Sequence, residues 1–342
     1  MLRRLTATAA AFVAAVLLSL PCWAAPETGA HAMILADAMT GEVLAEKNAD
    51  RQSLIASTTK IMTAYVVTQR CDLNRRVTVP PEATGIEGSS MYLKPGEELT
   101  VRELLYGLML HSGNDAAVAL ALACAGSVER FVQWMNESAQ TLGLHGTRFA
   151  NPNGLDDENN YSTARDLSAL TAAALQDPDF LQIVSTRCIR TAGRCLTNHN
   201  KLLWSLEGAI GVKTGYTRAA GRILVSAAER CGRRLIAVTI DDGNDWKDHT
   251  ALYEFGFSRY TMQTALRCGE AAVRLELMDG TQAELCAAQD FCYALAPGEA
   301  LRVQYPYYAF SCGEPGTDAR TGTVWLGDTC VGTIPLLWGE KE

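Results

Sequence analysis

Several features that indicate a cofactor or a polyanionic partner are missing from this chain. It has no Cys-x-x-Cys motif, and its five histidines show no metal-ligand spacing, so the sequence predicts no metal site. The formal net charge is −8 and no run of basic residues occurs, which argues against nucleic-acid binding. No stretch after the first 25 residues is apolar for long enough to span a bilayer.

The composition is that of a folded globular protein. Of the 342 residues, 48% are hydrophobic and 20% are charged, enough for one large domain and a smaller one. Residues 1–25 are typical of a secretory signal peptide. Arg3-Arg4 is the charged end, residues 5–20 are apolar, and Cys22-Trp23-Ala24-Ala25 supplies small residues for cleavage. The alternative for this segment is an uncleaved membrane anchor.

Eleven cysteines are present, and ten remain once Cys22 is removed with the signal. Export permits disulfides without requiring them. Cys188 with Cys195, and Cys286 with Cys292, are close enough in sequence to pair. The alternative is that these cysteines are buried free thiols that act as small hydrophobic side chains.

The stretch Ser57-Thr58-Thr59-Lys60 has the first chemically suggestive spacing. It precedes an apolar run, residues 61–67, which predicts a buried helix. A serine and a lysine three residues apart share one face of a helix. A serine hydroxyl needs an adjacent base to act as a nucleophile, and a lysine is such a base only when its pKa is lowered by burial or a second cation. The simpler interpretation is that Ser57 is an ordinary helix N-cap.

Two later stretches supply what this pair requires. Ser112-Gly113-Asn114 falls on a turn between two predicted helices, the first of which begins with a capping box of Thr100 and Glu103. Lys213, in the sequence Lys213-Thr214-Gly215-Tyr216, ends a predicted strand and is a candidate for the second cation. Taken alone, Ser-Gly-Asn is a common turn sequence between helices, and the lysine is an ordinary surface residue.

The rest of the chain predicts strands that enclose a helical region. Residues 32–36 and 42–45 are expected to form a hairpin, and residues 223–228 and 235–240 an antiparallel pair. Helices are expected between residues 60 and 205. From residue 264 helical periodicity stops, and strands are expected at 273–277, 300–303, 322–326 and 331–337. This predicts an α+β domain over residues 26–263 and a small all-β domain over 264–342.

The three motifs Ser57-x-x-Lys60, Ser112-x-Asn114 and Lys213-Thr214-Gly215 resemble, in this order, those of penicillin-binding proteins and β-lactamases. The whole chain after the signal is similar to the low-molecular-mass penicillin-binding proteins that are serine-type D-alanyl-D-alanine carboxypeptidases. Further stretches carry this likeness: Met91-Tyr92-Leu93, Asn151-Pro152-Asn153-Gly154-Leu155-Asp156 and Tyr161-Ser162-Thr163-Ala164. The resemblance implies a β-lactamase/transpeptidase-like fold, an antiparallel sheet flanked by helices, and a second β-rich domain.

The resemblance also implies the roles of the residues. Ser57 would attack the carbonyl between two D-alanines of a peptidoglycan stem pentapeptide, Lys60 would take its proton, and Ser112 would protonate the leaving amine. Asn114 would bind the peptide, and Lys213 with Thr214 would hold the terminal carboxylate. Gly215 permits close approach to the backbone, and the N–H groups of Ser57 and Tyr216 would bind the oxyanion. β-Lactams would acylate Ser57 in the same way. No cofactor is implied.

The chain departs from the family pattern at two places. His199 stands where some members have an arginine near the substrate carboxylate. The end of the chain, residues 336–342, is too short and too acidic for the amphipathic membrane helix of many members, so the sequence gives no support for membrane attachment. An exported enzyme of the cell envelope is expected. The alternatives are a β-lactamase, an endopeptidase or an esterase with the same serine, or a non-catalytic wall-binding protein.

Overall fold

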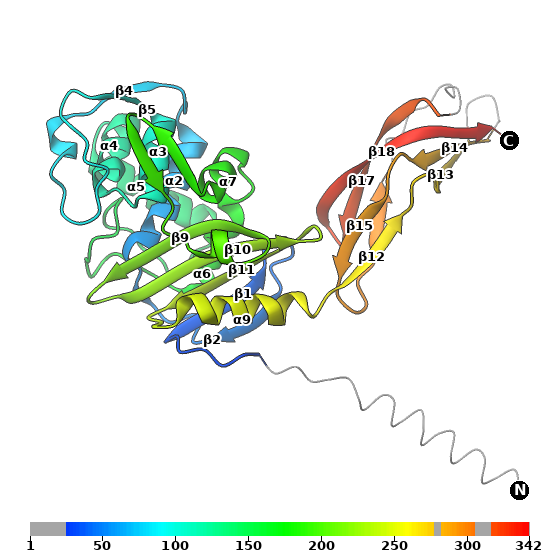
Figure 1. Cartoon of the computed structure of the whole chain (residues 1–342), viewed down its shortest axis with the longest axis horizontal. Coiled ribbons are helices and arrows are strands. Elements are labelled where there is room, and N and C mark those ends of the chain that lie inside the picture. The colour runs from blue at the N-terminus through cyan, green and yellow to red at the C-terminus, as the bar shows by residue number, and fades with distance from the viewer. Residues whose placement is uncertain (1–24, 277–281, 305–315, 342) are drawn as a thin grey trace, which may run out of the picture.

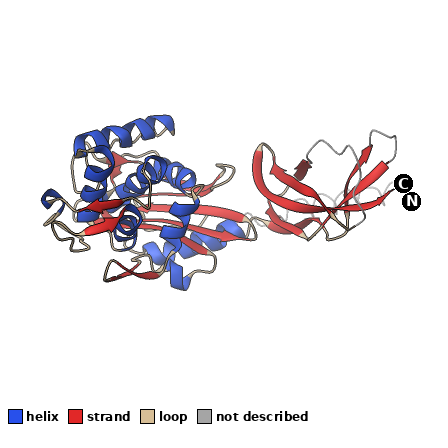
Figure 2. Cartoon of the chain, turned by 90° about the horizontal axis from the view of Figure 1, so that it is seen from above, coloured by secondary structure: helices blue, strands red, loops and turns tan. Residues whose placement is uncertain are grey.

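The computed structural model describes residues 25–276, 282–304 and 316–341. The predicted signal segment lies outside these residues except for its last residue, Ala25. The chain forms a larger body of helices around a sheet and a smaller, elongated body made of strands, which includes the C-terminal end of the chain (Figures 1 and 2). The predicted fold class, an antiparallel sheet flanked by helices and followed by an all-β domain, is confirmed.

A five-stranded sheet forms the middle of the larger body. Its strands, in spatial order, are β2 (Val43–Lys47), β1 (Ala32–Asp37), β11 (Arg233–Ile240), β10 (Gly221–Arg230) and β9 (Ala209–Thr217). Every neighbouring pair is antiparallel, and both predicted strand pairs are present. Strand β9, which carries Lys213, is at the edge of the sheet. One side of its backbone is therefore free to meet the helical part or a substrate.

The two faces of the sheet bury different cores because side chains alternate along a strand. Ile236 and Val238 of β11 belong to the large core shared with the helices, whereas Leu235 and Ala237 pack into a smaller core with Leu252. Leu252 is on α9 (Asp245–Phe257), which runs along this second face of the sheet (Figure 1).

Most of the expected helical region between residues 60 and 205 packs on the first face, whereas Leu202 of its last helix belongs to the smaller core. Its helices are η1 (Ala56–Thr59), α2 (Lys60–Arg70), η2 (Pro81–Ala83), α3 (Val101–Leu110), α4 (Asn114–Ala125), α5 (Val128–Thr141), α6 (Ala164–Ala174), α7 (Pro178–Ser185) and α8 (Leu202–Ser205). The capping box of Thr100 and Glu103 is present at the start of α3. Three short strand pairs join these helices: β3 (Ser53–Leu54) with β6 (Tyr161–Ser162), β4 (Arg76–Thr78) with β5 (Glu98–Thr100), and β7 (Cys188–Thr191) with β8 (Arg194–Thr197).

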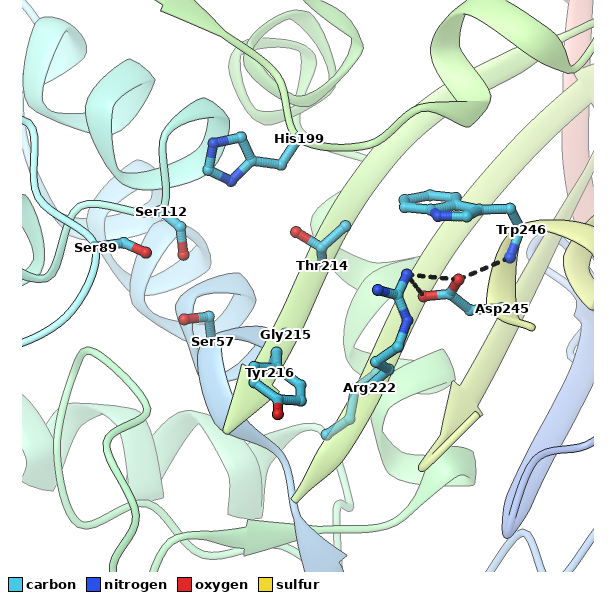
Figure 3. Close-up of a pocket in the computed structure, with 11 residues that line it drawn as sticks. Ser57, Ser89, Ser112, His199, Thr214, Gly215, Tyr216, Arg222, Asp245 and Trp246 are labelled. Atoms are coloured by element: carbon cyan, nitrogen blue, oxygen red, sulfur yellow. Dashed lines mark hydrogen bonds and ion pairs between the residues drawn. The ribbon is translucent and has the colours of Figure 1, made fainter. Parts of the chain in front are cut away.

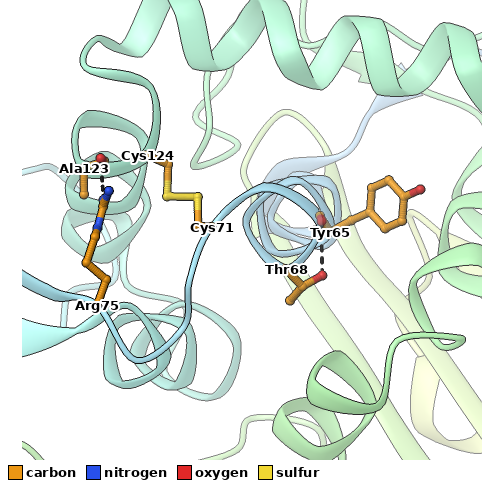
Figure 4. The surroundings of a disulfide bond; sticks show 6 residues. All are labelled: Tyr65, Thr68, Cys71, Arg75, Ala123 and Cys124. Atoms are coloured by element: carbon orange, nitrogen blue, oxygen red, sulfur yellow. Dashed lines mark hydrogen bonds between the residues drawn. A yellow bond between two sulfur atoms is a disulfide. The ribbon is translucent and has the colours of Figure 1, made fainter.

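The cysteine pairing differs from both expectations. A disulfide joins Cys71, just after α2, to Cys124 in the last turn of α4, with their Cα atoms 6.2 Å apart (Figure 4). The Cys188–Cys195 and Cys286–Cys292 pairs are wrong. In the β7–β8 hairpin the residue opposite Cys188 is Thr197, and Cys286 and Cys292 lie in different sheets. Among the described residues, every unpaired cysteine except the partly buried Cys286 is exposed, so the prediction of buried thiols is also wrong.

The C-terminal domain contains two further sheets. Strands β12 (Thr261–Leu266) and β15 (Phe291–Leu295) pair, and β13 (Ala271–Glu276), β14 (Gln282–Ala287), β18 (Thr329–Lys341), β17 (Asp318–Leu326) and β16 (Leu301–Gln304) form a sheet in that order. The boundary predicted at residue 264 falls inside β12. The two domains touch at the β10–β11 turn, where Ala294 N donates to Cys231 O at 3.2 Å. Within the described residues, no helix has the length and apolar character needed to cross a membrane.

Candidate active site

Ser57 lies in the short helix η1, directly before α2. Its hydroxyl is 2.9 Å from the Lys60 ammonium nitrogen, so the two side chains share one face as predicted. The interpretation of Ser57 as a plain N-cap is wrong, because no side chain caps η1 or α2. Ala56, just before the serine, has a φ of +44°, a left-handed conformation that is costly for a residue with a side chain. The turn that carries Ser57 is therefore held in place by its surroundings.

Lys60 is fully buried and has three neighbours that accept hydrogen bonds. Besides Ser57, its amine contacts Asn114 Oδ1 at 2.7 Å and the backbone oxygen of Asn153 at 2.5 Å. Burial lowers the pKa of Lys60 well below its ordinary value, and the charge of Lys213 lowers it further. When the amine is neutral, its two N–H groups suit the two carbonyl oxygens, and its lone pair can then face the hydroxyl of Ser57.

The Ser112–Asn114 turn joins α3 to α4 beside this pair. Ser112 has a left-handed φ of +62°, and Figure 3 shows its side chain directed toward Ser57. Asn114 spans two elements, because its Oδ1 accepts from Lys60 while its Nδ2 donates to Glu87 O at 2.6 Å. Asp115 fastens the preceding loop: its carboxylate accepts from the backbone N–H groups of Met91 and Leu93, both at 3.0 Å.

The Lys213-Thr214-Gly215 strand packs against η1. A Cβ placed on Gly215 would lie 3.3 Å from Ser57 N and from Ile55 O, so a glycine allows this close approach. Lys213 is buried, its amine donates to Thr214 O at 2.7 Å, and burial lowers its pKa to about 7. The predicted second cation therefore acts on Lys60 from inside the protein.

A pocket of about 300 Å³ opens between these elements (Figure 3). Of the eight predicted site residues, Ser57, Ser112, Thr214, Gly215 and Tyr216 line it, while Lys60, Asn114 and Lys213 lie buried behind its wall. Residues that the sequence did not suggest also line it: Ser89, Arg222, Ile223, Asp245 and Trp246. Asn153, a hydrogen-bond acceptor for Lys60, was missed as an individual residue although its stretch was part of the family likeness.

His199, which stands where some family members have an arginine, lines the same pocket. Its ring centroid is 5.3 Å from that of His111. Burial, with the charges of Lys213 and His111, lowers the pKa of His199 to about 4, so the ring is neutral near pH 7. Among the described residues, no group of three or more His, Cys, Asp or Glu side chains is placed to hold a metal ion.

Comparison with known proteins agrees with this geometry. The family model described as "D-alanyl-D-alanine carboxypeptidase" matches residues 22–244. The chain belongs to this family. It is 33% identical to the D-alanyl-D-alanine carboxypeptidase DacF of Bacillus subtilis, over 80% of this chain and 74% of that protein. It is 38% identical to DacC of Escherichia coli, over 82% of this chain and 72% of that protein.

Solved structures of the family have the same fold. Penicillin-binding protein 5 of Haemophilus influenzae superposes with a TM-score of 0.67 at 28% identity, over 92% of this chain and 99% of that one. The recognition from three sequence motifs is therefore confirmed. So is the predicted activity, that of a serine-type D-alanyl-D-alanine carboxypeptidase, a hydrolase that acts on peptidoglycan peptides and binds β-lactams.

Proposed function

We propose that the enzyme removes the terminal D-alanine from stem pentapeptides through an acyl-enzyme on Ser57. Lys60 takes the proton of the Ser57 hydroxyl as its oxygen attacks the carbonyl carbon of the penultimate D-alanine. The observation that carries this assignment is the 2.9 Å contact between Ser57 and a buried lysine whose pKa burial lowers. The carbonyl oxygen becomes an oxyanion, which accepts hydrogen bonds from the backbone N–H groups of Ser57 and Tyr216.

Breakdown of this intermediate requires a proton on the leaving amine. Ser112 gives its hydroxyl proton to the nitrogen and recovers one from the Lys60 ammonium, and D-alanine departs. Water then cleaves the ester and restores Ser57. Asn114 contributes to peptide binding, and Lys213 with Thr214 attracts the substrate carboxylate. Support comes from the pocket, which brings Ser57, Ser112 and Thr214 to one cavity (Figure 3).

Export to the cell envelope is part of the same proposal. The substrate is a wall precursor outside the cytoplasmic membrane, and residues 1–25 have the pattern of a secretory signal. The Cys71–Cys124 disulfide suits an oxidising compartment. We also propose that the C-terminal domain extends from about residue 264.

Intact-protein mass spectrometry after treatment with penicillin tests the mechanism, with Ser57→Ala as the matched variant. We expect a long-lived adduct on Ser57 that is absent from the variant, and release of D-alanine from a pentapeptide by the unmodified enzyme. If penicillin stays intact and no adduct forms, the serine mechanism is wrong. If penicillin is consumed without an adduct, the enzyme is a β-lactamase.

A further inference from the structure

One cationic side chain reaches the pocket from the strand next to Lys213. Arg222 is on β10, directly opposite Tyr216 of β9, and it is the only lysine or arginine among the residues that line the pocket. Its side chain is 44% exposed. Lys213 is buried, and His199 is neutral near pH 7 because its pKa is lowered to about 4. Arg222 therefore supplies the permanent positive charge that a ligand in this pocket would meet.

Asp245 fixes the position of this arginine. It is the first residue of α9, and its side chain is only 3% exposed. Both carboxylate oxygens accept from the same guanidinium nitrogen, Nη2, at 2.8 and 2.7 Å. One of them also accepts from Trp246 N at 2.9 Å, and the indole ring lies 5.9 Å from the guanidinium carbon. The arginine is held between a buried anion and an aromatic ring, so it has little freedom to turn away.

The remaining donors of Arg222 are available. Within the part of the chain that the structure describes, neither Nε nor Nη1 has a hydrogen-bond partner. Nη2 is occupied by Asp245, so Nε and Nη1 each offer a separate N–H group from which an incoming carboxylate can accept. Figure 3 shows the guanidinium near Thr214, whose hydroxyl points toward the side of the pocket with Ser112 and His199. The arrangement offers an incoming anion a guanidinium and a hydroxyl from two adjacent strands.

We propose that Arg222, positioned by Asp245, selects substrates with a free C-terminal carboxylate and binds that group together with Thr214. This assignment rests on the proposed function and makes it more specific. A carboxypeptidase must distinguish a chain end from an internal peptide bond, and the carboxylate is the chemical difference between them. In this chain, where position 199 is a neutral histidine, the cation comes from β10 instead.

The test compares two substrates that differ only in this group: diacetyl-Lys-D-Ala-D-Ala and its C-terminal amide. For Arg222→Gln, we expect kcat/KM on the acid to fall about 10- to 100-fold, the range for loss of a hydrogen bond to a charged group. On the amide it should change less than about threefold. Arg222→Lys keeps the charge but loses the fixed Nε and Nη1 donors, so the fall in its kcat/KM on the acid should be intermediate. Asp245→Asn should lower the ratio of kcat/KM on the acid to kcat/KM on the amide without abolishing activity.

Arg230→Gln is the matched control. Arg230 is at the opposite end of β10, pairs with Glu254 of α9 at 2.7 Å and lies 4.7 Å from the centroid of the Phe257 ring. Its removal breaks the same kind of contact outside the pocket, so the acid-to-amide ratio should stay that of the unmodified enzyme. Equal losses on both peptides in Arg222→Gln and Arg222→Lys would overturn the assignment. If the unmodified enzyme cleaved neither peptide and formed no adduct on Ser57, the proposed function would fail instead.

Discussion

Arg233 is the residue whose removal should destabilise the protein most among its charged side chains. It is the first residue of β11 and is completely buried. Its Nε pairs with Asp37 at 2.5 Å, and Asp37 is also completely buried. On its other side it reaches Glu299 of the C-terminal domain at 2.9 Å, and its guanidinium carbon lies 4.2 Å from the ring centroid of Tyr260. One side chain thus joins the central sheet to the second domain.

The expected cost follows from what Arg233→Met would leave behind. Asp37 would keep the two backbone donors of the β1–β2 turn, Met39 N at 2.8 Å and Thr40 N at 2.9 Å, but would lose its only neighbouring cation in the described structure. Breaking a buried pair from one side costs about 3–5 kcal/mol, because the other charge stays buried. Asp37→Asn in the same protein removes that charge. The double variant should therefore lose less free energy of unfolding than the two single variants summed, by about 1–3 kcal/mol.

Urea unfolding followed by tryptophan fluorescence measures these differences. Glu299→Gln removes the link between Arg233 and the second domain but leaves the Arg233–Asp37 pair in place. Because the Glu299 side chain is 22% exposed, this change should lower the free energy of unfolding by only about 1 kcal/mol. Carboxypeptidase activity of the folded Glu299→Gln protein should stay unchanged. The reasoning would be refuted if Arg233→Met lowered the free energy of unfolding by less than about 1 kcal/mol. It would also be refuted if the loss in the double variant equalled the sum of the two single losses within about 0.5 kcal/mol.

Two further predictions concern the nucleophile and its base. In Gly154→Ala, the new methyl group would overlap Ala56 O beside Ser57, so penicillin acylation should slow about 100-fold. Gly126→Ala is the control, because Gly126 has nearly the same φ (+83° against +84° for Gly154) but its new methyl group would meet no atom. An equal slowing of acylation in Gly126→Ala would contradict the explanation by overlap. In Lys213→Gln, loss of the repelling charge raises the pKa of Lys60, so the acidic limb of the acylation rate moves to higher pH. Asp115→Asn removes a negative charge that raises the pKa of Lys60, so the acidic limb should move to lower pH. If the limb moved in the same direction in both variants, the electrostatic explanation would be ruled out.

The contact between Ser57 and Lys60 could be predicted from the sequence because it depends on a short spacing. A serine and a lysine three residues apart must meet on one turn of helix, and the 2.9 Å contact follows from that spacing. The need of Lys60 for a second cation then directed attention to Lys213, which is 153 residues away. The strand pairs of the sheet followed from short apolar runs bounded by turn residues, and the fold class from the family resemblance.

The Cys71–Cys124 disulfide shows where such reasoning stops. The two cysteines are 53 residues apart, and each falls at the C-terminal end of a separate helix, α2 and α4. Their meeting depends on how these helices pack, which neither periodicity nor spacing reveals. Proximity in sequence favoured Cys188 with Cys195 instead. That choice fails because the hairpin register places Thr197, not Cys195, opposite Cys188.

Arg222 was missed for a related reason, and the reason shows what makes a specificity residue hard to predict. An arginine at the start of a strand, followed by an aspartate 23 residues later, has no local signature. Its meaning arises from two facts of the fold: the register that sets Arg222 opposite Tyr216, and the start of α9 at Asp245 on the same face of the sheet. The Ser57–Lys60 contact lies within one turn of helix, whereas the proposed carboxylate contact of Arg222 depends on how separate elements meet. A member of this family can therefore keep its three motifs and still move its cation from one strand or loop to another.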